Sequence, residues 1–361
     1  MSARPDLLGV VVPARLDGAF AKRTAGALLS SADAGAPDTI VVIVDDGDNE
    51  GFDGGLPVDE RLVVATTDDH GPGHARTAGA RAVAGIAARR GVVPANAWVI
   101  SLDADVVLDD AFLSRWATTI TASEADVLGA PAHFGPVSGE APLLDDVLAA
   151  SGWMWHDTSL YERFVGLVNL GGCNHAVSLE TARANGWYRQ PTGTIDGVEQ
   201  IVAGDDWDFG LRARMAGFEV ARVDGPAVVT SMRRIAADPV GFLAGRSYER
   251  AFLPVRGSPD GSSWPPEEAW VDVARRGRAR LVAHFLLKPL LAGIEPSGEL
   301  AWFLGPRLTG ELESLRARAP KLEGEERWNA YRTALVSMLF EPETFGWCER
   351  VAARIAGAGT P

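Results

Sequence analysis

The stretch Val99-Ile100-Ser101-Leu102-Asp103-Ala104-Asp105 is an apolar run that ends in two carboxylates one residue apart. On an extended chain, residues i and i+2 point to the same side, so Asp103 and Asp105 can converge on one cation or one polar ligand. Hard divalent cations such as Mg²⁺ and Mn²⁺ take oxygen ligands of this kind. Alternatively, the two acids cap a helix that begins near Asp109, and the rest of the chain decides between these interpretations.

Similar apolar runs occur upstream of this stretch and define the fold class. Three such runs lie at residues 8–13, 39–44 and 61–66, and the stretch itself, at residues 98–102, is the fourth. Near-continuous apolar runs are typical of strands buried on both faces of a parallel sheet. Helical periodicity at residues 18–34 and 74–90 separates them. This alternation predicts an α/β fold with a mostly parallel central sheet flanked by helices.

Acidic clusters follow two of these predicted strands. Asp45-Asp46-Gly47-Asp48 comes after the second strand, as Asp103 and Asp105 come after the fourth. In open α/β sheets, ligands bind outside the carboxyl ends of the strands. Two clusters at one sheet edge therefore favour a binding site over helix capping. A third cluster, at residues 204–208, suits the first turn of a helix, where the helix dipole alone favours acids.

The remaining chain is assigned to a continuation of the sheet and a helical C-terminal region. Predicted helices lie at residues 109–122, 143–164, 181–185, 204–217 and 239–252, and predicted strands at residues 126–131 and 218–223. The segment 190–204 is rich in Gly, Thr and Pro and is predicted to be a loop. A polar Gly/Ser/Pro linker at 256–266 suggests a catalytic domain over residues 1–255. Residues 256–361, mostly helical by pattern, would then form an acceptor-side or oligomerisation element.

Composition narrows the class of partners. The formal net charge of −14 over 361 residues argues against nucleic acid and anionic membranes, which attract cationic faces. The two cysteines, Cys173 and Cys348, are not spaced as metal ligands, which favours a reduced, cytoplasmic setting. No signal peptide is visible, and the apolar stretch 281–294 is too short and too polar to span a bilayer.

In their order and spacing, these motifs resemble those of family 2 glycosyltransferases with the GT-A fold. The matching pieces are Val10-Val11-Val12-Pro13, Val44-Asp45-Asp46-Gly47, Gly73-His74-Ala75-Arg76-Thr77-Ala78-Gly79, Leu102-Asp103-Ala104-Asp105, Gly171-Gly172-Cys173-Asn174 and Gly204-Asp205-Asp206-Trp207-Asp208. The resemblance covers about residues 8–235. It implies transfer of a single sugar from a nucleotide-diphosphate sugar to a hydroxyl of a small-molecule or lipid-like acceptor.

The resemblance also implies roles for matching residues on the donor side. Asp45 would contact the nucleotide base with Arg76 close to it, and Asp103 would hold the ribose or diphosphate region. Asp105 would bind Mg²⁺ or Mn²⁺, which stabilises the leaving diphosphate. Further donor-binding residues would be Pro13, Arg15, Gly172, Asn174 and Arg233. For Arg233, whose guanidinium suits phosphate, a structural ion pair is an equal alternative.

The family's Glu-Asp pair aligns with Asp205 and Asp206. Asp206 would be the general base that deprotonates the acceptor hydroxyl, so that attack inverts the anomeric configuration. Asp205 or Asp208 could raise the pKa of this base. Because the first acid is Asp rather than Glu, the choice between Asp205 and Asp206 stays open. Thr77 replaces the usual Asn, and the Gln-x-x-Arg-Trp motif of processive polymerising members is absent, which argues against a polysaccharide synthase.

Other functions are consistent with parts of this pattern. A sugar-phosphate nucleotidyltransferase would need a glycine-dense loop after the first strand, which residues 13–18 lack. A glycosidase would use two carboxylates but needs neither a metal nor the cluster at Asp45. A non-catalytic nucleotide-sugar-binding protein would keep the fold without turnover. His175 either lines the sugar pocket or is hydrogen-bonded within the core. The oligomeric state is left open.

Overall fold

The computed structural model divides into two compact units. The first comprises Met1–Pro136, Val168–Pro191 and Ala203–Ser231, and the second comprises Val137–Leu167, Thr192–Val202 and Met232–Pro361. The structure describes residues 4–14, 18–46, 55–69, 71–135, 168, 170–190, 192–195, 198–201 and 204–231, with isolated positions between 306 and 350. The helices predicted at 143–164, at 239–252 and over most of 267–361, and the domain boundary predicted near residue 256, lie outside the described residues.

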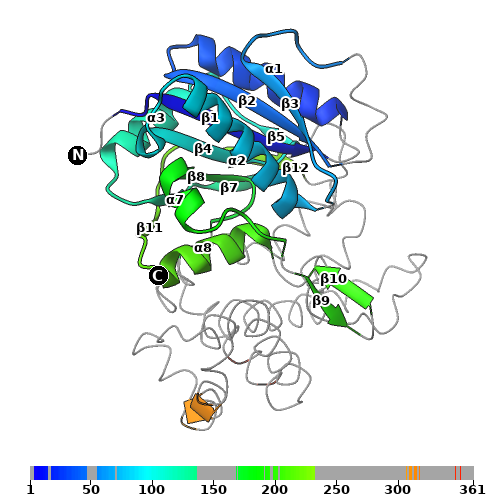
Figure 1. Ribbon diagram of the computed structural model, residues 1–361, viewed down its shortest axis with the longest axis vertical. Helices are drawn as coiled ribbons and strands as arrows, with labels where there is room; N and C mark the ends of the chain where they lie inside the picture. The colour runs from blue at the N-terminus through cyan, green and yellow to red at the C-terminus, as the bar shows by residue number, and fades with distance from the viewer. Residues whose placement is uncertain are drawn as a thin grey trace. The chain divides into compact units, whose positions relative to one another are not determined.

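A seven-stranded sheet forms the centre of the first unit (Figure 1). Its strands are β1 (Leu7–Ala14), β2 (Asp38–Asp45), β3 (Leu62–Thr66), β4 (Ala97–Leu102), β6 (Val127–Gly129), β8 (Asn174–Ser178) and β11 (Val220–Arg222). The strand order is β11-β6-β8-β4-β1-β2-β3. All neighbours pair in parallel except β8, which runs antiparallel between β4 and β6. The predicted mostly parallel α/β sheet is therefore confirmed.

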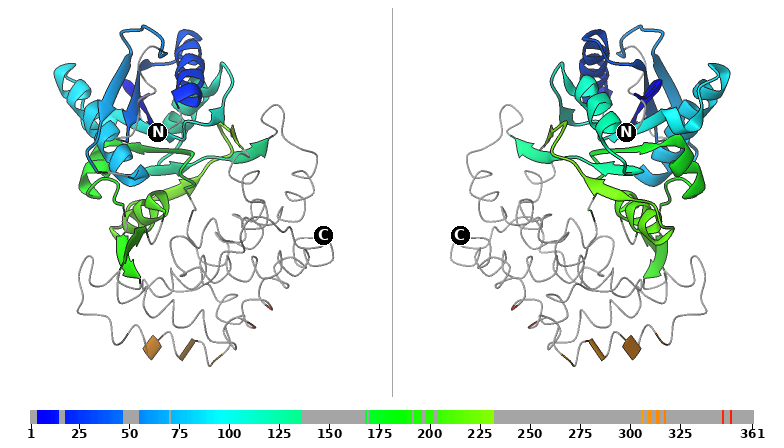
Figure 2. Two further views of the ribbon diagram at one scale, coloured as in Figure 1. Left: turned by 90° about the vertical axis from the view of Figure 1, so that its right-hand side faces the viewer. Right: turned by 90° about the vertical axis from the view of Figure 1, so that its left-hand side faces the viewer.

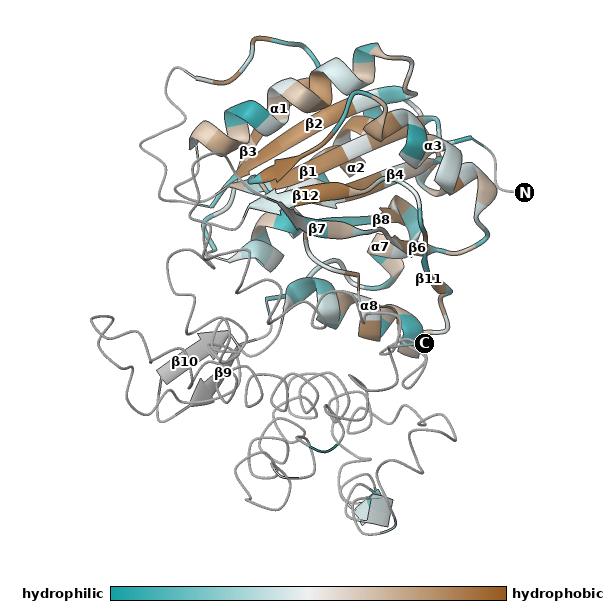
Figure 3. Ribbon diagram, turned by 180° about the vertical axis from the view of Figure 1, so that it is seen from behind, coloured by the Kyte–Doolittle hydropathy of each residue, from teal (hydrophilic) through white to brown (hydrophobic). Residues whose placement is uncertain are grey.

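Helices cover both faces of this sheet, as the side views in Figure 2 show. They are α1 (Gly18–Asp33), α2 (Pro72–Arg89), α3 (Phe112–Ala122), α7 (Leu179–Ala184) and α8 (Asp205–Met215), with a short 3₁₀ turn at Pro94–Asn96. Alternate residues of a strand point to opposite faces. In β1, Leu8 and Val10 accordingly pack in the core under α1 and α3, whereas Leu7 and Val11 pack in the core under α2. Burial on both faces explains the unbroken apolar runs in the sequence, seen as brown strands in Figure 3.

A second, three-stranded sheet continues from the turn after β4. Its strands are β5 (Val106–Val107), β7 (Ala132–Gly135) and β12 (Val228–Ser231), in the order β5-β12-β7. Strand β5 begins directly after Asp105 and pairs antiparallel with β12. The turn that carries the two acids is therefore held between a strand of each sheet.

The predicted loop at 190–204 is wrong for part of its length. Strands β9 (Thr192–Ile195) and β10 (Val198–Ile201) pair there as an antiparallel hairpin in the second unit. The sequence between them is Asp196-Gly197, a strong two-residue hairpin signal flanked by β-branched residues. Overall Gly, Thr and Pro content concealed this local signal. No helix among the described residues is long and apolar enough to cross a membrane.

Candidate functional site

The carboxyl ends of β1, β2 and β4 lie at one edge of the large sheet. In the strand register, Pro13 pairs with Val44, Ala14 pairs with Asp45, and Val11 pairs with Ser101. Asp103 follows the end of β4, so it comes level with the last residues of β1. The structure therefore brings the predicted residues Pro13, Asp45 and Asp103 to the same edge, as expected for a ligand site in an open α/β sheet.

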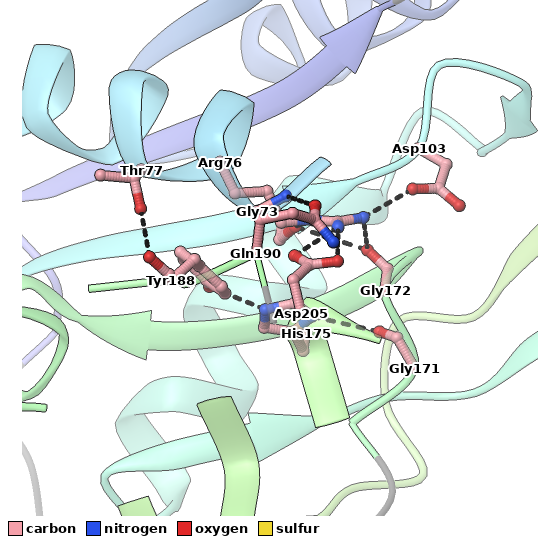
Figure 4. Close-up of polar contacts among 11 residues, drawn as sticks. Gly73, Arg76, Thr77, Asp103, Gly171, Gly172, His175, Tyr188, Gln190 and Asp205 are labelled. Atoms are coloured by element: carbon pink, nitrogen blue, oxygen red, sulfur yellow. Dashed lines mark hydrogen bonds and ion pairs between the residues drawn. The ribbon is translucent and has the colours of Figure 1, made fainter. Parts of the chain in front are cut away.

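Arg76 is the centre of the polar network at this edge (Figure 4). Its side chain is only 3% exposed. Nη1 donates to both carboxylate oxygens of Asp205, at 2.8 and 2.6 Å. Nη2 donates to Asp103 Oδ1 at 2.7 Å and to the Gly172 carbonyl at 2.8 Å, and Nε donates to Ser101 Oγ at 2.7 Å. One side chain of α2 thus joins β4, the loop before β8 and the first turn of α8.

These contacts differ from the role predicted for Arg76. The resemblance implied a position close to Asp45 and the nucleotide base, whereas the guanidinium is directed to Asp103 and Asp205. The planar guanidinium has five N–H donors, which suit two carboxylates and a carbonyl at once. Because the group is buried, the loss of any of these hydrogen bonds would leave a polar atom without a partner. Arg76 therefore holds Asp103, Asp205 and the Gly172 carbonyl together.

The charges in this network depend on one another. Burial alone would lower the pKa of Arg76, but the carboxylates of Asp205, Asp103 and Asp206 more than offset burial and raise it, so the guanidinium stays charged. Burial raises the pKa of Asp205, and Asp206 and Asp103 raise it further, against the opposing effect of Arg76. Three carboxyl groups thus share one buried cation, and such an excess of acidic groups attracts a further positive charge.

Asp205 and Asp206 occupy different environments, although they are adjacent on α8. Asp205 is 3% exposed and is bound to Arg76, whereas Asp206 is only partly buried. Two glycines leave room for the Asp206 carboxylate. A Cβ on Gly204 would lie 2.5 Å from Asp206 Oδ1, and a Cβ on Gly172 would lie 3.5 Å from Asp206 Oδ2 and 2.9 Å from Arg76 Nη2. A side chain at Gly204 would therefore displace the Asp206 carboxylate, and a side chain at Gly172 would displace the Arg76 guanidinium.

Asp208, the third acid of the cluster, forms an ion pair within α8. Its Oδ2 accepts a hydrogen bond from Arg212 Nε at 2.7 Å, one helical turn away. Arg212 also donates to the carbonyls of Asn185 and, at 2.8 Å, Trp187. Asp208 therefore orients Arg212, and Arg212 ties α8 to the segment after α7.

His175 belongs to the core beside the network. Its ring is fully buried, Nδ1 lies 3.1 Å from the Gly171 carbonyl, and Nε2 lies 2.7 Å from the Tyr188 hydroxyl. Because a carbonyl only accepts, Nδ1 carries the proton and Nε2 accepts from Tyr188. Burial and the nearby Arg76 lower the pKa of His175 to about 3, so the ring is neutral. Of the two interpretations, the hydrogen-bonded core histidine is confirmed.

Thr77 and Gln190 connect α2 to the segment at residues 188–190, next to the Arg76 network. Thr77 Oγ1 donates to the Tyr188 carbonyl at 2.7 Å, which gives the residue that replaces the usual Asn a definite role. Gln190 Oε1 accepts from the Gly73 amide at 3.0 Å. Gln190 and Ser101 were missed by the sequence analysis, because a single polar residue becomes informative only once its partners are known.

Asp45 and Asp46 have different surroundings at the end of β2. Asp45 is partly buried, whereas Asp46 is 4% exposed and both its oxygens accept from the Gly71 amide, at 2.9 and 3.1 Å. This bond fixes the residue that precedes α2. The role predicted for Asp45, contact with the nucleotide base, stays a prediction.

Asn174 ties β8 to two loops. It is completely buried, and its amide nitrogen donates to the carbonyls of Pro131 at 2.8 Å and Pro226 at 2.6 Å. Its Oδ1 has no hydrogen-bond partner among the described residues. A direct contact of Asn174 with the donor stays a prediction. Gly172 contributes its carbonyl to Arg76. The remaining predicted residues, Arg15 and Arg233, lie outside the described part of the chain.

Asp105 is the residue predicted to bind a metal. It is 5% exposed in the turn between β4 and β5. No three His, Cys, Asp or Glu side chains of the described residues come together as a ready-made cation site. A donor set of one or two carboxylates still fits Mg²⁺ or Mn²⁺, which complete their shells with substrate phosphates and water.

Comparison with known proteins identifies the family. The family described as "Glycosyltransferase like family 2" matches residues 5–238, well over half of the chain. The chain therefore belongs to this family, and it is a glycosyltransferase. The mostly parallel sheet covered by helices on both faces is the GT-A fold that the sequence resemblance implied. A search among curated protein sequences finds no match.

Solved structures of two other proteins resemble this fold at low sequence identity. The mannosyltransferase PcManGT from Pyrobaculum calidifontis, solved with GDP-Man and Mn²⁺, is 14% identical over 99% of this chain and 88% of that chain, with a TM-score of 0.44. TarS 1–349 from S. aureus is 14% identical over 91% and 90%, with a TM-score of 0.41, and its complex with UDP is 15% identical over the same shares, with a TM-score of 0.42.

Proposed function

We propose that this protein is a metal-dependent, inverting glycosyltransferase with Asp206 as its general base. It would transfer a single sugar from a nucleotide-diphosphate sugar to a hydroxyl of a small-molecule or lipid-like acceptor. The observation that carries the assignment of the base is the unequal environment of the two adjacent acids. Asp205 is committed to Arg76 by two hydrogen bonds, whereas Asp206 is partly exposed at the same edge of the sheet.

A general base must reach the proton that it removes and must not be held by a permanent cation. Asp205 meets neither condition. Both its carboxylate oxygens accept from the same guanidinium nitrogen of Arg76, so Asp205 is held by a permanent cation and is not free to reach an acceptor hydroxyl. The Asp206 carboxylate lies close to Gly204, where a side chain would crowd it, and in ordinary contact distance of Gly172. This arrangement supports Asp206 as the group that accepts the acceptor's hydroxyl proton.

The donor side of the proposal rests on Asp45, Asp103 and Asp105. Asp103, held by Arg76 and 34% exposed, keeps one oxygen for the ribose or diphosphate region. Asp105 would hold Mg²⁺ or Mn²⁺, which when bound neutralises the charge that develops on the leaving diphosphate. In this proposal, Asp45 contacts the nucleobase of the donor, as the resemblance implied. Residues 1–255 would form the catalytic domain, with residues 256–361 on the acceptor side or in an oligomer contact.

Replacement of Asp206 tests the assignment of the base. We expect Asp206→Asn to keep nucleotide binding within about threefold and to lower turnover by about 10²- to 10⁴-fold, the usual contribution of a positioned base. Release of nucleoside diphosphate from UDP-, GDP- and TDP-sugars with Mn²⁺ measures turnover, and calorimetry with UDP or GDP measures binding. Asp110→Asn, an exposed acid that begins the turn before α3, is the matched control and should retain full activity.

Two results would contradict the proposal in different ways. Full activity of Asp206→Asn would exclude this residue as the base. Nucleotide binding by the wild type without turnover, across a broad screen of acceptors, would favour the non-catalytic nucleotide-sugar-binding protein. Release of pyrophosphate from a nucleoside triphosphate and a sugar phosphate would instead revive the nucleotidyltransferase.

A further inference from the structure

Thr24 is a polar residue on the buried face of α1, and its hydroxyl bonds to the turn that carries the acids. The side chain is 1% exposed and packs beside apolar residues such as Ala21, Ala25 and Leu28. Oγ1 donates to the Ala104 carbonyl at 2.7 Å and lies 3.3 Å from the Val106 carbonyl. A threonine hydroxyl within a helix usually bonds the carbonyl one turn earlier. Here it reaches a turn eighty residues further along the chain.

The two peptide groups that flank Asp105 are each held by another element. The Ala104 carbonyl belongs to the peptide before Asp105 and accepts from Thr24 of α1. The Asp105 carbonyl belongs to the peptide after it and accepts from the Ser231 amide of β12 at 3.1 Å. Peptide groups are planar, so a residue has only two soft backbone torsions. A hydrogen bond to each plane therefore restricts those two torsions and, with them, the direction of the Asp105 Cβ.

Asp103 is positioned by a different device. Its carboxylate accepts directly from Arg76 of α2. The contact that holds the Asp103 side chain and the two contacts that hold the Asp105 backbone therefore come from different elements. Removing the Thr24 hydroxyl should disturb Asp105 while leaving the contact between Asp103 and Arg76 in place.

We infer that Thr24 is a positioning residue that sets the Asp105 carboxylate for the divalent cation. The inference rests on the proposed function, which assigns the metal to Asp105. Groups that orient metal ligands without touching the metal commonly change metal affinity by about 10- to 100-fold when removed. A hydroxyl on a neighbouring helix that holds the ligand's own backbone acts in the same way.

Replacement by a residue of the same shape tests this inference. We expect Thr24→Val to bind Mn²⁺ about tenfold more weakly in the presence of UDP, and separately of GDP. The electron paramagnetic resonance signal of free Mn²⁺ reports binding without any need for turnover. Nucleotide affinity in EDTA should stay unchanged, and Thr24→Ser, which restores the hydroxyl, should bind Mn²⁺ like the wild type.

Thr39 provides a matched control on the same sheet. It is 2% exposed, and its hydroxyl donates to the Pro37 carbonyl at 2.8 Å near the amino end of β2, the end of that strand away from Asp45. Thr39→Val removes the same kind of bond and should lower the melting temperature without changing the affinity for Mn²⁺. If Thr24→Val does not fold, Thr24→Ala, which adds no methyl group next to the carbonyl, takes its place.

The outcomes separate the inference from the proposed function. Mn²⁺ binding by Thr24→Val that equals the wild type, or an equal loss in Thr39→Val, would overturn the positioning role and leave the metal site of the proposed function intact. Failure of the wild type itself to bind Mn²⁺ with either nucleotide would instead overturn the metal role of Asp105, and the positioning role with it.

Discussion

Single residues in this site are defined by their partners. Arg76 makes five hydrogen bonds to four groups, two of them carboxylates, while almost completely buried. A buried charge without its partner is costly, so the guanidinium and Asp205 each require the other. The two adjacent acids therefore differ in their surroundings: Asp205 is bound to Arg76, whereas Asp206, the proposed base, is partly exposed.

His175 leads to a prediction at the same scale about the dependence of stability on pH. The pKa of the folded-state ring, about 3, lies below its ordinary value of 6.5. The unfolded chain therefore binds the proton more readily, and the stability from the neutral buried ring is complete above pH 6.5 and is lost as the pH falls toward 3. By linkage this loss amounts to about 2 kcal/mol at pH 5.

The comparison with His175→Asn isolates this effect. Asparagine does not titrate but keeps a donor for the Gly171 carbonyl, so the variant should lose about 2 kcal/mol less than the wild type between pH 7.5 and pH 5. Urea unfolding at the two pH values measures the difference. Asp205, whose raised pKa acts in the opposite direction, is present in both proteins and cancels. Identical pH dependence of the two proteins would show that His175 is not the titrating group.

At the scale of elements, α2 lies unusually close to the central strands because of glycine. A Cβ on Gly79 would lie 2.3 Å from Val11 Cγ1 of β1 and 2.9 Å from Val44 Cγ2 of β2. On the strand side, a Cβ on Gly9 would lie 2.3 Å from Val83 Cγ1 of α2. The helix and the sheet are therefore in close contact at these glycines. Arg76 lies on the same helix, so this contact determines how close its backbone is to the strand ends.

Two glycine-to-alanine changes on α2 should have opposite effects. Gly79→Ala should lower the free energy of unfolding by about 1 to 2 kcal/mol, because overpacking outweighs the gain in helix propensity. Gly85→Ala, whose nearest neighbour to a new Cβ is the mobile end of Arg89 at 3.6 Å, should raise it by roughly 0.5 to 1 kcal/mol. Urea unfolding measures both. A stabilised Gly79→Ala would show that the helix can move away from the sheet at no cost.

At the scale of the whole molecule, a ligand that binds only the folded state raises its stability by mass action. At a hundred times its dissociation constant, Mn²⁺ with UDP or GDP should contribute about 2.7 kcal/mol. For a protein of 361 residues, that gain corresponds to a rise in melting temperature of roughly 3 to 4 °C. A thermal-shift screen of nucleotides and nucleotide sugars, with and without Mn²⁺, measures this rise. It also identifies which nucleobase the protein prefers in its donor.

Asp105→Ala provides the counterpart for this screen. The variant should lose the part of the shift that depends on Mn²⁺ and keep the part that the nucleotide provides alone. Asp110→Ala is the surface control and should behave as the wild type. A shift in Asp105→Ala that still depends on Mn²⁺ would assign the cation to other residues.

Much of the site was predictable from local patterns. The strand ends place Asp45 and Asp103 at one edge because parallel strands share their direction, and the Asp-rich start of α8 is a local signal. The roles of Asn174 and Asp208 could not be predicted in this way. Whether a polar residue faces a ligand or ties loops together depends on which carbonyls and cations lie beside it, and those come from distant parts of the chain.

The amino-acid sequence by itself determined the α/β class, the strand and helix alternation, and the family, because apolar periodicity and short motifs are local properties of the chain. Only the tertiary structure decided that Arg76 serves Asp205 and Asp103, that β8 runs antiparallel, and that Thr24 supports the turn before Asp105. Each of these depends on contacts between residues that are between 27 and 129 positions apart or on the direction in which the chain returns to the sheet. Such contacts form only when the elements pack, and no local pattern encodes them.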